Sequence, residues 1–252
     1  MCQGWHVRRV LLPAAVAALA AVGAYTTALR QRQLRWGATS EEVGMTLPGD
    51  DLLGAADLVA TRAVTIRAAV EDVWPWLAQM GQGRGGLYSY DWVENLVGCQ
   101  MNSADRVVPE WQEVAVGDDF RLHPDVALKI KLVAPPHALV VQGGVSATGD
   151  VATGDEAAPY DFTWAFVLVP AAPDITRLVV RERYLCRTTA ARVLVEAVSA
   201  VSFVMTERML RGIRDRAEAR PAPIGRAGGR GRLDRGTDPS RTVRPASTRR
   251  RL

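Results

Sequence analysis

The sequence predicts an α+β fold in which a curved antiparallel sheet wraps around one long helix near the carboxyl terminus. The stretch Ala190–Arg216 contains no proline and only one glycine, so it can form a helix about 40 Å long. The residues before it, from Val59 to Tyr184, fall mostly into short runs rich in β-branched and aromatic residues, which are typical of strands. A helix with an apolar stripe needs a hydrophobic partner, and a sheet with one apolar face provides it.

Strands and two short helices are expected ahead of the long helix. The strands are expected at Val59–Ile66, Asp119–Leu122, Ala127–Val133, Leu139–Gln142, Phe162–Val169 and Thr176–Leu185. The short helices are expected at Glu71–Met80 and Tyr90–Val97, with a glycine-rich loop between them. Bulky and smaller residues alternate in the fifth strand, so its bulky face should meet the core. That face consists of Phe162, Trp164, Phe166 and Leu168.

One stripe of the long helix is expected to pack on the sheet. Its apolar residues recur at steps of three and four, as on one helix face. They are Leu194, Ala197, Val198, Val201, Met205 and Met209. Between Val193 and Met205 the helix is apolar nearly all round, so another side could dock on a partner, a second copy or a bilayer.

The chain is expected to divide into four parts. Residues 1–35 contain the uncharged stretch 10–29, which has arginines on both sides and is long enough to span a bilayer core of about 30 Å. We expect an uncleaved transmembrane anchor, with a removed signal peptide as the alternative. Residues 36–58 are predicted to be a linker with a short helix, and residues 59–218 to be the folded domain. The chain is then a single-pass membrane protein, and the cytoplasmic side is slightly favoured for its domain.

Residues 219–252 are predicted to form a disordered, arginine-rich tail. They carry ten Arg and two Asp, so the total charge of +4 arises from this tail and the rest of the chain is net acidic. Beside a membrane anchor, such a tail can bind anionic lipid headgroups, and it indicates no specific nucleic-acid partner. Three cysteines without CxxC spacing and three scattered histidines predict no metal site, and no cofactor motif is indicated.

Aromatic and acidic residues gather directly after the glycine-rich loop. Tyr90, Asp91 and Glu94 are weak candidates for acid–base catalysis there, although such residues also serve as core aromatics and helix-start carboxylates. A second cluster, Arg181 to Arg183, alternates along the last strand. Either Glu182 or its two arginine neighbours must face the helix, and a charge buried there would need a partner.

The order of elements resembles the helix-grip fold of the SRPBCC superfamily, which includes START, polyketide cyclase and pollen-allergen domains. The residues 69–77 (AVEDVWPWL) are similar to the start of the first helix in polyketide-cyclase-like members. The segments 81–95 (GQGRGGLYSYDWVEN), 103–112 (SADRVVPEWQ), 176–184 (TRLVVRERY) and 203–218 are similar to an uncharacterised, membrane-anchored bacterial subgroup. The resemblance covers residues 36–218. It implies a cavity between sheet and helix that holds a hydrophobic ligand, sometimes with catalysis inside it.

The resemblance therefore predicts binding of a lipid, isoprenoid or polyketide-like molecule in an internal cavity. The expected ligand contacts are Trp74, Leu87, Tyr88, Trp92, Glu110, Trp164, Arg183, Val198, Val201, Met205 and Met209. A cyclase- or dehydratase-type enzyme that uses the same cavity is one alternative, and a non-catalytic interaction module is another. Parts that form a cavity are clearer in the sequence than any proton-moving pair, which favours binding over catalysis.

Overall fold

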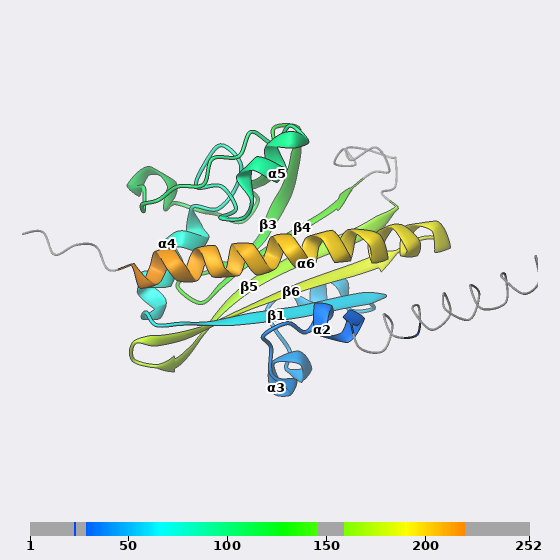
Figure 1. Cartoon of the computed structure of the whole chain (residues 1–252), viewed down its shortest axis with the longest axis horizontal. Helices are drawn as coiled ribbons and strands as arrows, with labels where there is room; N and C mark the ends of the chain where they lie inside the picture. The colour runs from blue at the N-terminus through cyan, green and yellow to red at the C-terminus, as the bar shows by residue number, and fades with distance from the viewer. Residues whose placement is uncertain (1–22, 24–28, 146–158, 220–252) are drawn as a thin grey trace, which may run out of the picture. The chain divides into compact units, whose positions relative to one another are not determined.

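The computed structural model describes residue 23 and residues 29–145 and 159–219, which lie in one compact unit. One antiparallel sheet has the strand order β1-β6-β5-β4-β3-β2, and the long helix α6 lies across one face of it (Figure 1). The strands are β1 Leu58–Ile66, β2 Asp119–His123, β3 Val126–Ala134, β4 Ala138–Val145, β5 Tyr160–Ala172 and β6 Ile175–Cys186. The helices are α2 Arg30–Leu34, α3 Ser40–Gly44, α4 Val70–Ala78, α5 Asp91–Leu96 and α6 Thr189–Glu218, with 3-10 turns η2 Asp50–Leu53 and η3 Pro109–Trp111.

This is the predicted α+β helix-grip arrangement, a six-stranded antiparallel sheet with a long carboxy-terminal helix. Apart from residues 23 and 29, the predicted anchor 10–29 lies outside the described residues. The predicted tail beyond residue 219 also lies outside them, as does most of the loop between β4 and β5. The predicted domain boundaries stay a prediction.

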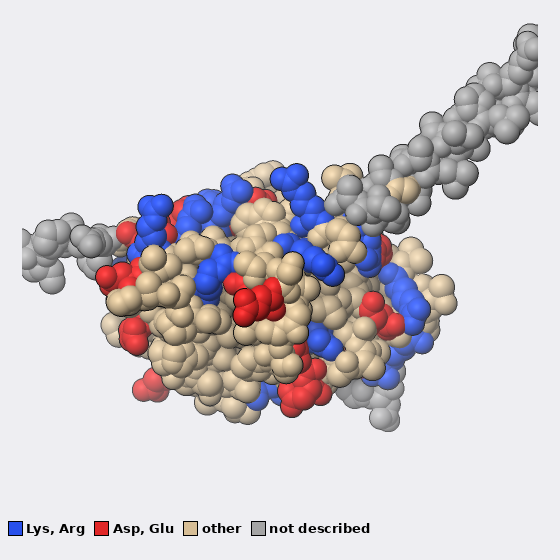
Figure 2. Space-filling model, turned by 90° about the horizontal axis from the view of Figure 1, so that it is seen from below, with Lys and Arg blue, Asp and Glu red and all other residues tan. Residues whose placement is uncertain are grey.

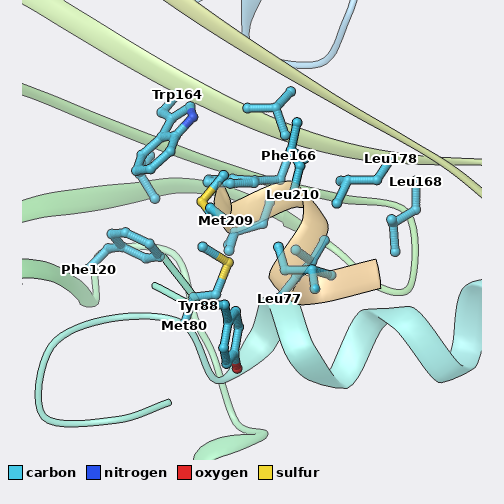
Figure 3. Packing of buried hydrophobic residues seen from close by; sticks show 14 of the residues in the cluster. Leu77, Met80, Tyr88, Phe120, Trp164, Phe166, Leu168, Leu178, Met209 and Leu210 are labelled. Carbon is cyan, nitrogen blue, oxygen red and sulfur yellow. The ribbon is translucent and has the colours of Figure 1, made fainter. Parts of the chain in front are cut away.

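The main core lies between the sheet and the helices α4 and α6. It includes the expected bulky face of β5, because Phe162, Trp164 and Phe166 are all buried on the side of α6. Their rings pack against one another and against Phe120, with the Trp164 and Phe166 centroids 4.7 Å apart. Figure 3 shows how Met209 and Leu210 of α6 fill the space opposite these rings. The interface under the carboxy-terminal half of α6 is therefore a packed core.

Of the predicted inner stripe of α6, Met209 is buried as expected, but the face that packs on the sheet is shifted by about one residue, roughly 100° around the helix axis, from the rest of that stripe. The residues that α6 buries are Ala191, Val195, Ser199, Thr206, Met209, Leu210, Gly212 and Ile213. Val201 is 64% exposed and Leu194 is 42% exposed, although both belong to the predicted stripe. The positions of apolar residues did not predict the buried side of α6, because that side contains Ser199 and Thr206. The Ser199 hydroxyl accepts a hydrogen bond from Gln33, and the Thr206 hydroxyl donates to Glu182.

The opposite face of the sheet is covered by the segment between α2 and β1. Leu47 from this segment joins a second buried cluster with residues of four strands. The other members are Ala63, Ala138, Val167 and Val179. Figure 2, which views the molecule from below relative to Figure 1, shows basic and acidic side chains interspersed on that side, so the charge there has no single sign.

Arginines of β6 attach this segment to the sheet. Arg181 is 3% exposed, and its guanidinium donates to Asp50 Oδ2 at 2.5 Å and to three main-chain carbonyls, those of Glu42, Val43 and Met45. Arg177 pairs with Glu42 at 2.7 Å. Burial favours a higher pKa for Glu42, but the Arg177 pair and the Thr39 hydrogen bonds outweigh it, so the pKa of Glu42 is lowered.

Two contacts fix α2 against the amino-terminal half of α6. Arg30 Nε donates to Glu196 Oε1 at 2.6 Å, and Gln33 Nε2 donates to Ser199 Oγ at 3.2 Å.

In the described part of the chain, α6 is the single helix long and apolar enough to cross a membrane, with a mean hydropathy of 1.4 over its best 18-residue window. A helix that packs on the sheet of its own domain can also meet this criterion of length and hydropathy, and α6 packs on the sheet in this way.

Candidate functional site

A buried ion pair lies beneath α6 and organises the site. Arg62 of β1 donates through Nη1 to Glu182 Oε1 at 2.7 Å, and the two side chains are 1% and 2% exposed. Arg62 Nε also donates to the carbonyl of Gln33 at 3.1 Å. The strand register places Glu182 next to Ala60, diagonal to Arg62 on the same face of the sheet. Glu182 is therefore the charge of the last strand that faces the helix, and its guanidinium partner comes from β1.

Three hydroxyl groups complete the coordination of Glu182. Ser202 Oγ lies 2.8 Å and 2.9 Å from the two carboxylate oxygens, and Thr206 Oγ1 donates at 3.0 Å. The hydroxyl of Tyr184 donates to Oε2 at 3.2 Å. Burial, and then the charge of Glu182, raises the pKa of Tyr184 well above its usual value, so this hydroxyl keeps its proton. Within the described residues, only Arg62 Nη2, Trp164 Nε1 and Glu94 Oε2 are buried side-chain atoms without a hydrogen-bond partner.

Above this cluster, an open pocket of about 430 Å³ follows the amino-terminal half of α6. We call it the α6 groove. The described residues that line it are Ala197, Val198, Val201, Ser202 and Met205. Its wall is almost wholly apolar, and the hydroxyl of Ser202 is its polar point. The sequence predicted an internal cavity, whereas this pocket is open to the outside.

A second pocket, of about 460 Å³, lies between the start of α5 and the carboxy-terminal half of α6. We call it the α5 cleft. The described residues that line it are Tyr88, Ser89, Tyr90, Asp91, Trp92, Ser103, Arg208 and Arg216. Asp91 holds Ser103 in place, because Asp91 Oδ2 accepts from the main-chain N–H at 2.7 Å and Oδ1 accepts from the hydroxyl at 2.6 Å. The guanidinium carbons of Arg208 and Arg216 lie 5.9 Å and 4.8 Å from the centroids of the Tyr90 and Tyr88 rings.

Glu94 is buried near this cleft but is absent from its described lining. Burial first, and then the charge of Asp91, raises the pKa of Glu94 to about 7. This carboxyl can therefore gain or lose a proton near neutral pH, which is the property that acid–base chemistry requires.

The structure brings about half of the sequence-predicted residues into the two pockets beside α6 and places the others elsewhere. Val198, Val201 and Met205 line the α6 groove, and Tyr88, Tyr90, Asp91 and Trp92 line the α5 cleft. Trp164 and Met209 belong to the packed core, and Trp74 and Leu87 pack against its edge.

Two of the predicted polar contacts lie elsewhere. Arg183 extends from the other face of β6, where Nε donates to the carbonyl of Leu53 at 2.9 Å. Its neighbour Glu182 faces α6, so strand alternation sends Arg183 away from the groove. Glu110 is exposed in the turn η3.

Sequence reasoning missed Arg62, Ser202, Thr206, Arg208 and Arg216. The sequence did contain a pattern that could have identified Arg62, and another that could have identified Ser202 and Thr206. Arg62 is a lone charge in the middle of an apolar strand, and Ser202 and Thr206 are spaced four apart beside the apolar residues of a helix. Among the described residues, no group of three His, Cys, Asp or Glu side chains could hold a metal ion.

The fold and the two pockets define an α+β protein whose sheet holds a long helix beside an apolar groove. No family model and no curated protein matches the chain. Solved structures that are similar include protein MLL2253 from Mesorhizobium loti, at 17% identity and a TM-score of 0.35 over 61% of this chain and 96% of that one. Hypothetical protein jhp0584 from Helicobacter pylori gives 13% and 0.41 over 69% and 96%. Norcoclaurine synthase from Thalictrum flavum gives 16% and 0.37 over 63% and 84%.

Proposed function

We propose that this protein binds a hydrophobic small molecule, a lipid, isoprenoid or polyketide-like compound, in the α6 groove, as a membrane-anchored member of the SRPBCC superfamily. The observation that carries the proposal is the composition of the groove. Val198, Val201 and Met205 form its wall, and they lie beside a single hydroxyl, that of Ser202. A pocket that is mostly apolar with one fixed polar group is typical of small-molecule sites.

The energetics favour such a ligand. Covering an exposed valine or methionine side chain contributes about 1.5–3 kcal/mol, so a few such contacts approach the roughly 8 kcal/mol of a micromolar complex before the entropy costs of binding. Because the Ser202 hydroxyl donates to Glu182, its oxygen is left to accept a hydrogen bond from the ligand. A ligand with a hydroxyl or amide donor beside its apolar part fits best.

Membrane attachment is part of the proposal. The helix α2 begins at Arg30, and Arg30 forms an ion pair with Glu196 of α6. An anchor at residues 10–29 would therefore hold the amino-terminal half of α6, and with it the groove, close to a bilayer. The arginine-rich tail, residues 219–252, would bind anionic headgroups of the same membrane.

A titration of the full chain, held in nanodiscs of zwitterionic lipid, with a neutral apolar fluorophore tests the proposal. The wild type should bind the fluorophore stoichiometrically above the signal of empty nanodiscs. Val201→Asp should weaken binding about tenfold or more, because it puts a charge in the groove wall. Val193→Asp is the matched control, since Val193 is 69% exposed on α6 outside the described lining. Equal binding by the two variants would contradict the proposal.

Glu94 favours a second candidate, a cyclase- or dehydratase-type enzyme. Its pKa of about 7 and its place on α5, three residues after the cleft residue Asp91, would suit proton transfer to a ligand in the α5 cleft. An NMR titration of Glu94 should then show a further pKa change when a polyketide analogue is added. A pKa that does not respond would remove the catalytic alternative.

A further inference from the structure

The α6 groove and the α5 cleft are neighbours on one side of α6. Ser89, which lines the cleft, donates through Oγ to the carbonyl of Met205 at 3.1 Å and touches its sulfur at 3.7 Å. Met205 in turn lines the groove. One residue pair thus joins the two pockets.

The spacing along α6 puts both pockets on one stripe. At about 100° per residue, positions 198, 201, 205, 208, 212 and 216 fall within about 80° of one another around the helix axis. The stripe is apolar from Val198 to Met205 and basic at Arg208 and Arg216. Gly212 lies between the arginines, where α6 meets Tyr88 so closely that a Cβ atom would lie 2.2 Å from the Tyr88 carbonyl oxygen.

The arginines of this stripe differ from their neighbours on the helix. Arg211 pairs with Glu207, and Arg214 pairs with Asp215. In the part of the chain that the structure describes, Arg208 stacks on Tyr90 and has no carboxylate partner. Arg216 donates to two carbonyls, those of Ala104 at 2.7 Å and Gly212 at 3.1 Å. The acid in the cleft, Asp91, is already held by Ser103. The cleft therefore has an excess of cationic donors.

We propose that the bound molecule is an amphiphile whose anionic headgroup lies between Arg208 and Arg216 and whose apolar part lies in the α6 groove. The inference rests on the proposed function and adds the charge of the ligand to it. A guanidinium binds a carboxylate or a phosphate with two parallel hydrogen bonds, and the exposed ring of Trp92 lines the same cleft as the two arginines. A fatty acid and a lipid phosphate share this chemistry.

Displacement of the neutral fluorophore from the full chain in zwitterionic nanodiscs tests the inference, with dodecanoate, dodecyl phosphate and dodecanol as probes. The wild type should bind at least one anionic probe about tenfold more tightly than dodecanol, as a charge-assisted hydrogen bond would provide. The tighter of the two anions identifies a fatty-acid or a phosphate headgroup. Arg208→Gln should bring the ratio of the anionic to the neutral affinity close to one, and Arg208→Lys should restore part of it.

The matched control is Arg214→Gln, which removes the same charge from another side of α6 and should keep the wild-type ratio. Arg208 is the primary site of substitution because Arg216 also supports the fold through Ala104. If the wild type binds dodecanol and both anions equally, the charged headgroup site is refuted while hydrophobic binding stands. If none of the probes displaces the fluorophore from the wild type, the proposed function itself fails.

Discussion

Arg62 and Glu182 form an ion pair on two neighbouring strands, 2.7 Å apart and almost completely buried beneath α6. Ser202 and Thr206 of α6 donate to the same carboxylate. A buried charge must find partners, so these hydroxyls fix which side of the helix faces the sheet. The rotation of α6 about its axis also sets the positions of the groove residues, because Val198, Val201 and Met205 lie beside Ser202 on the helix surface.

Removing one member of this pair should destabilise the protein strongly. Glu182→Ala leaves Arg62 buried without its counter-charge, and we expect a loss of about 3–5 kcal/mol in the free energy of unfolding. The double variant Arg62→Met with Glu182→Leu should lose less than the single variant, because it leaves no buried charge. Urea denaturation of the wild type and of both variants measures the difference. A double variant that is as unstable as Glu182→Ala, or more so, would contradict the assignment.

Arg181→Met should loosen the segment that covers the far face of the sheet. The change removes a buried ion pair with Asp50 and three bonds to carbonyls, at a cost of about 3–5 kcal/mol. Hydrogen exchange should accelerate in residues 42–53 first. Arg187→Met is the control, since the Arg187 side chain is 50% exposed in its pair with Asp161 and its loss should cost about 0–1 kcal/mol.

Gly212→Ala should destabilise the contact between α6 and Tyr88. Alanine favours a helix by about 1 kcal/mol, but the added methyl would overlap the Tyr88 carbonyl and cost about 1–3 kcal/mol or more in displaced structure. We expect a lower melting temperature, measured by circular dichroism. Gly44→Ala, at the end of α3 where the new Cβ meets nothing within 4 Å, should change stability by less than about 0.5 kcal/mol.

Glu94 should make stability fall as the pH rises. Its pKa is raised from 4.5 to about 7 in the folded protein, so between these values the folded state holds a proton that the unfolded state has lost. Stability is therefore highest below pH 4.5 with respect to this group and declines up to about pH 7. In Glu94→Gln that decline, on the order of 2–3 kcal/mol because one unit of pKa difference between the folded and unfolded states contributes about 1.4 kcal/mol, should disappear from urea denaturation curves at pH 5 and pH 8. A variant with the wild-type pH dependence would assign the decline to other groups.

The fold was predictable because its elements have strong periodic signals. The alternation of Phe162, Trp164 and Phe166 fixed the inner face of β5, and the length without proline fixed α6. The rotation of α6 was not predictable from apolarity, since its amino-terminal half is apolar on several sides. The polar partners that set it, Arg62 and Glu182, are 120 residues apart in the chain. Their pairing depends on strand register, which no local pattern encodes.

The site was predictable in part for the same reason. Tyr90, Asp91 and Trp92 form a local cluster, and the structure keeps them together in the α5 cleft. Arg208 could not be assigned, because an arginine on a helix is usually solvated and only the three-dimensional arrangement shows it beside Tyr90. Arg183 was ambiguous for a different reason, since both faces of β6 are covered and alternation alone leaves two solutions.

The arginines Arg177, Arg181 and Arg183 project from one side of β6 and find their acids in Glu42 and Asp50. A fragment cut to begin at the first strand would lose both acids. Its sheet would then present three mutually repelling cations around the bare side chain of Val179, a surface prone to misassembly during refolding. Recombinant versions of this protein should therefore keep the residues from Arg30 onward, and limited proteolysis between α3 and β1 should abolish recovery of soluble material.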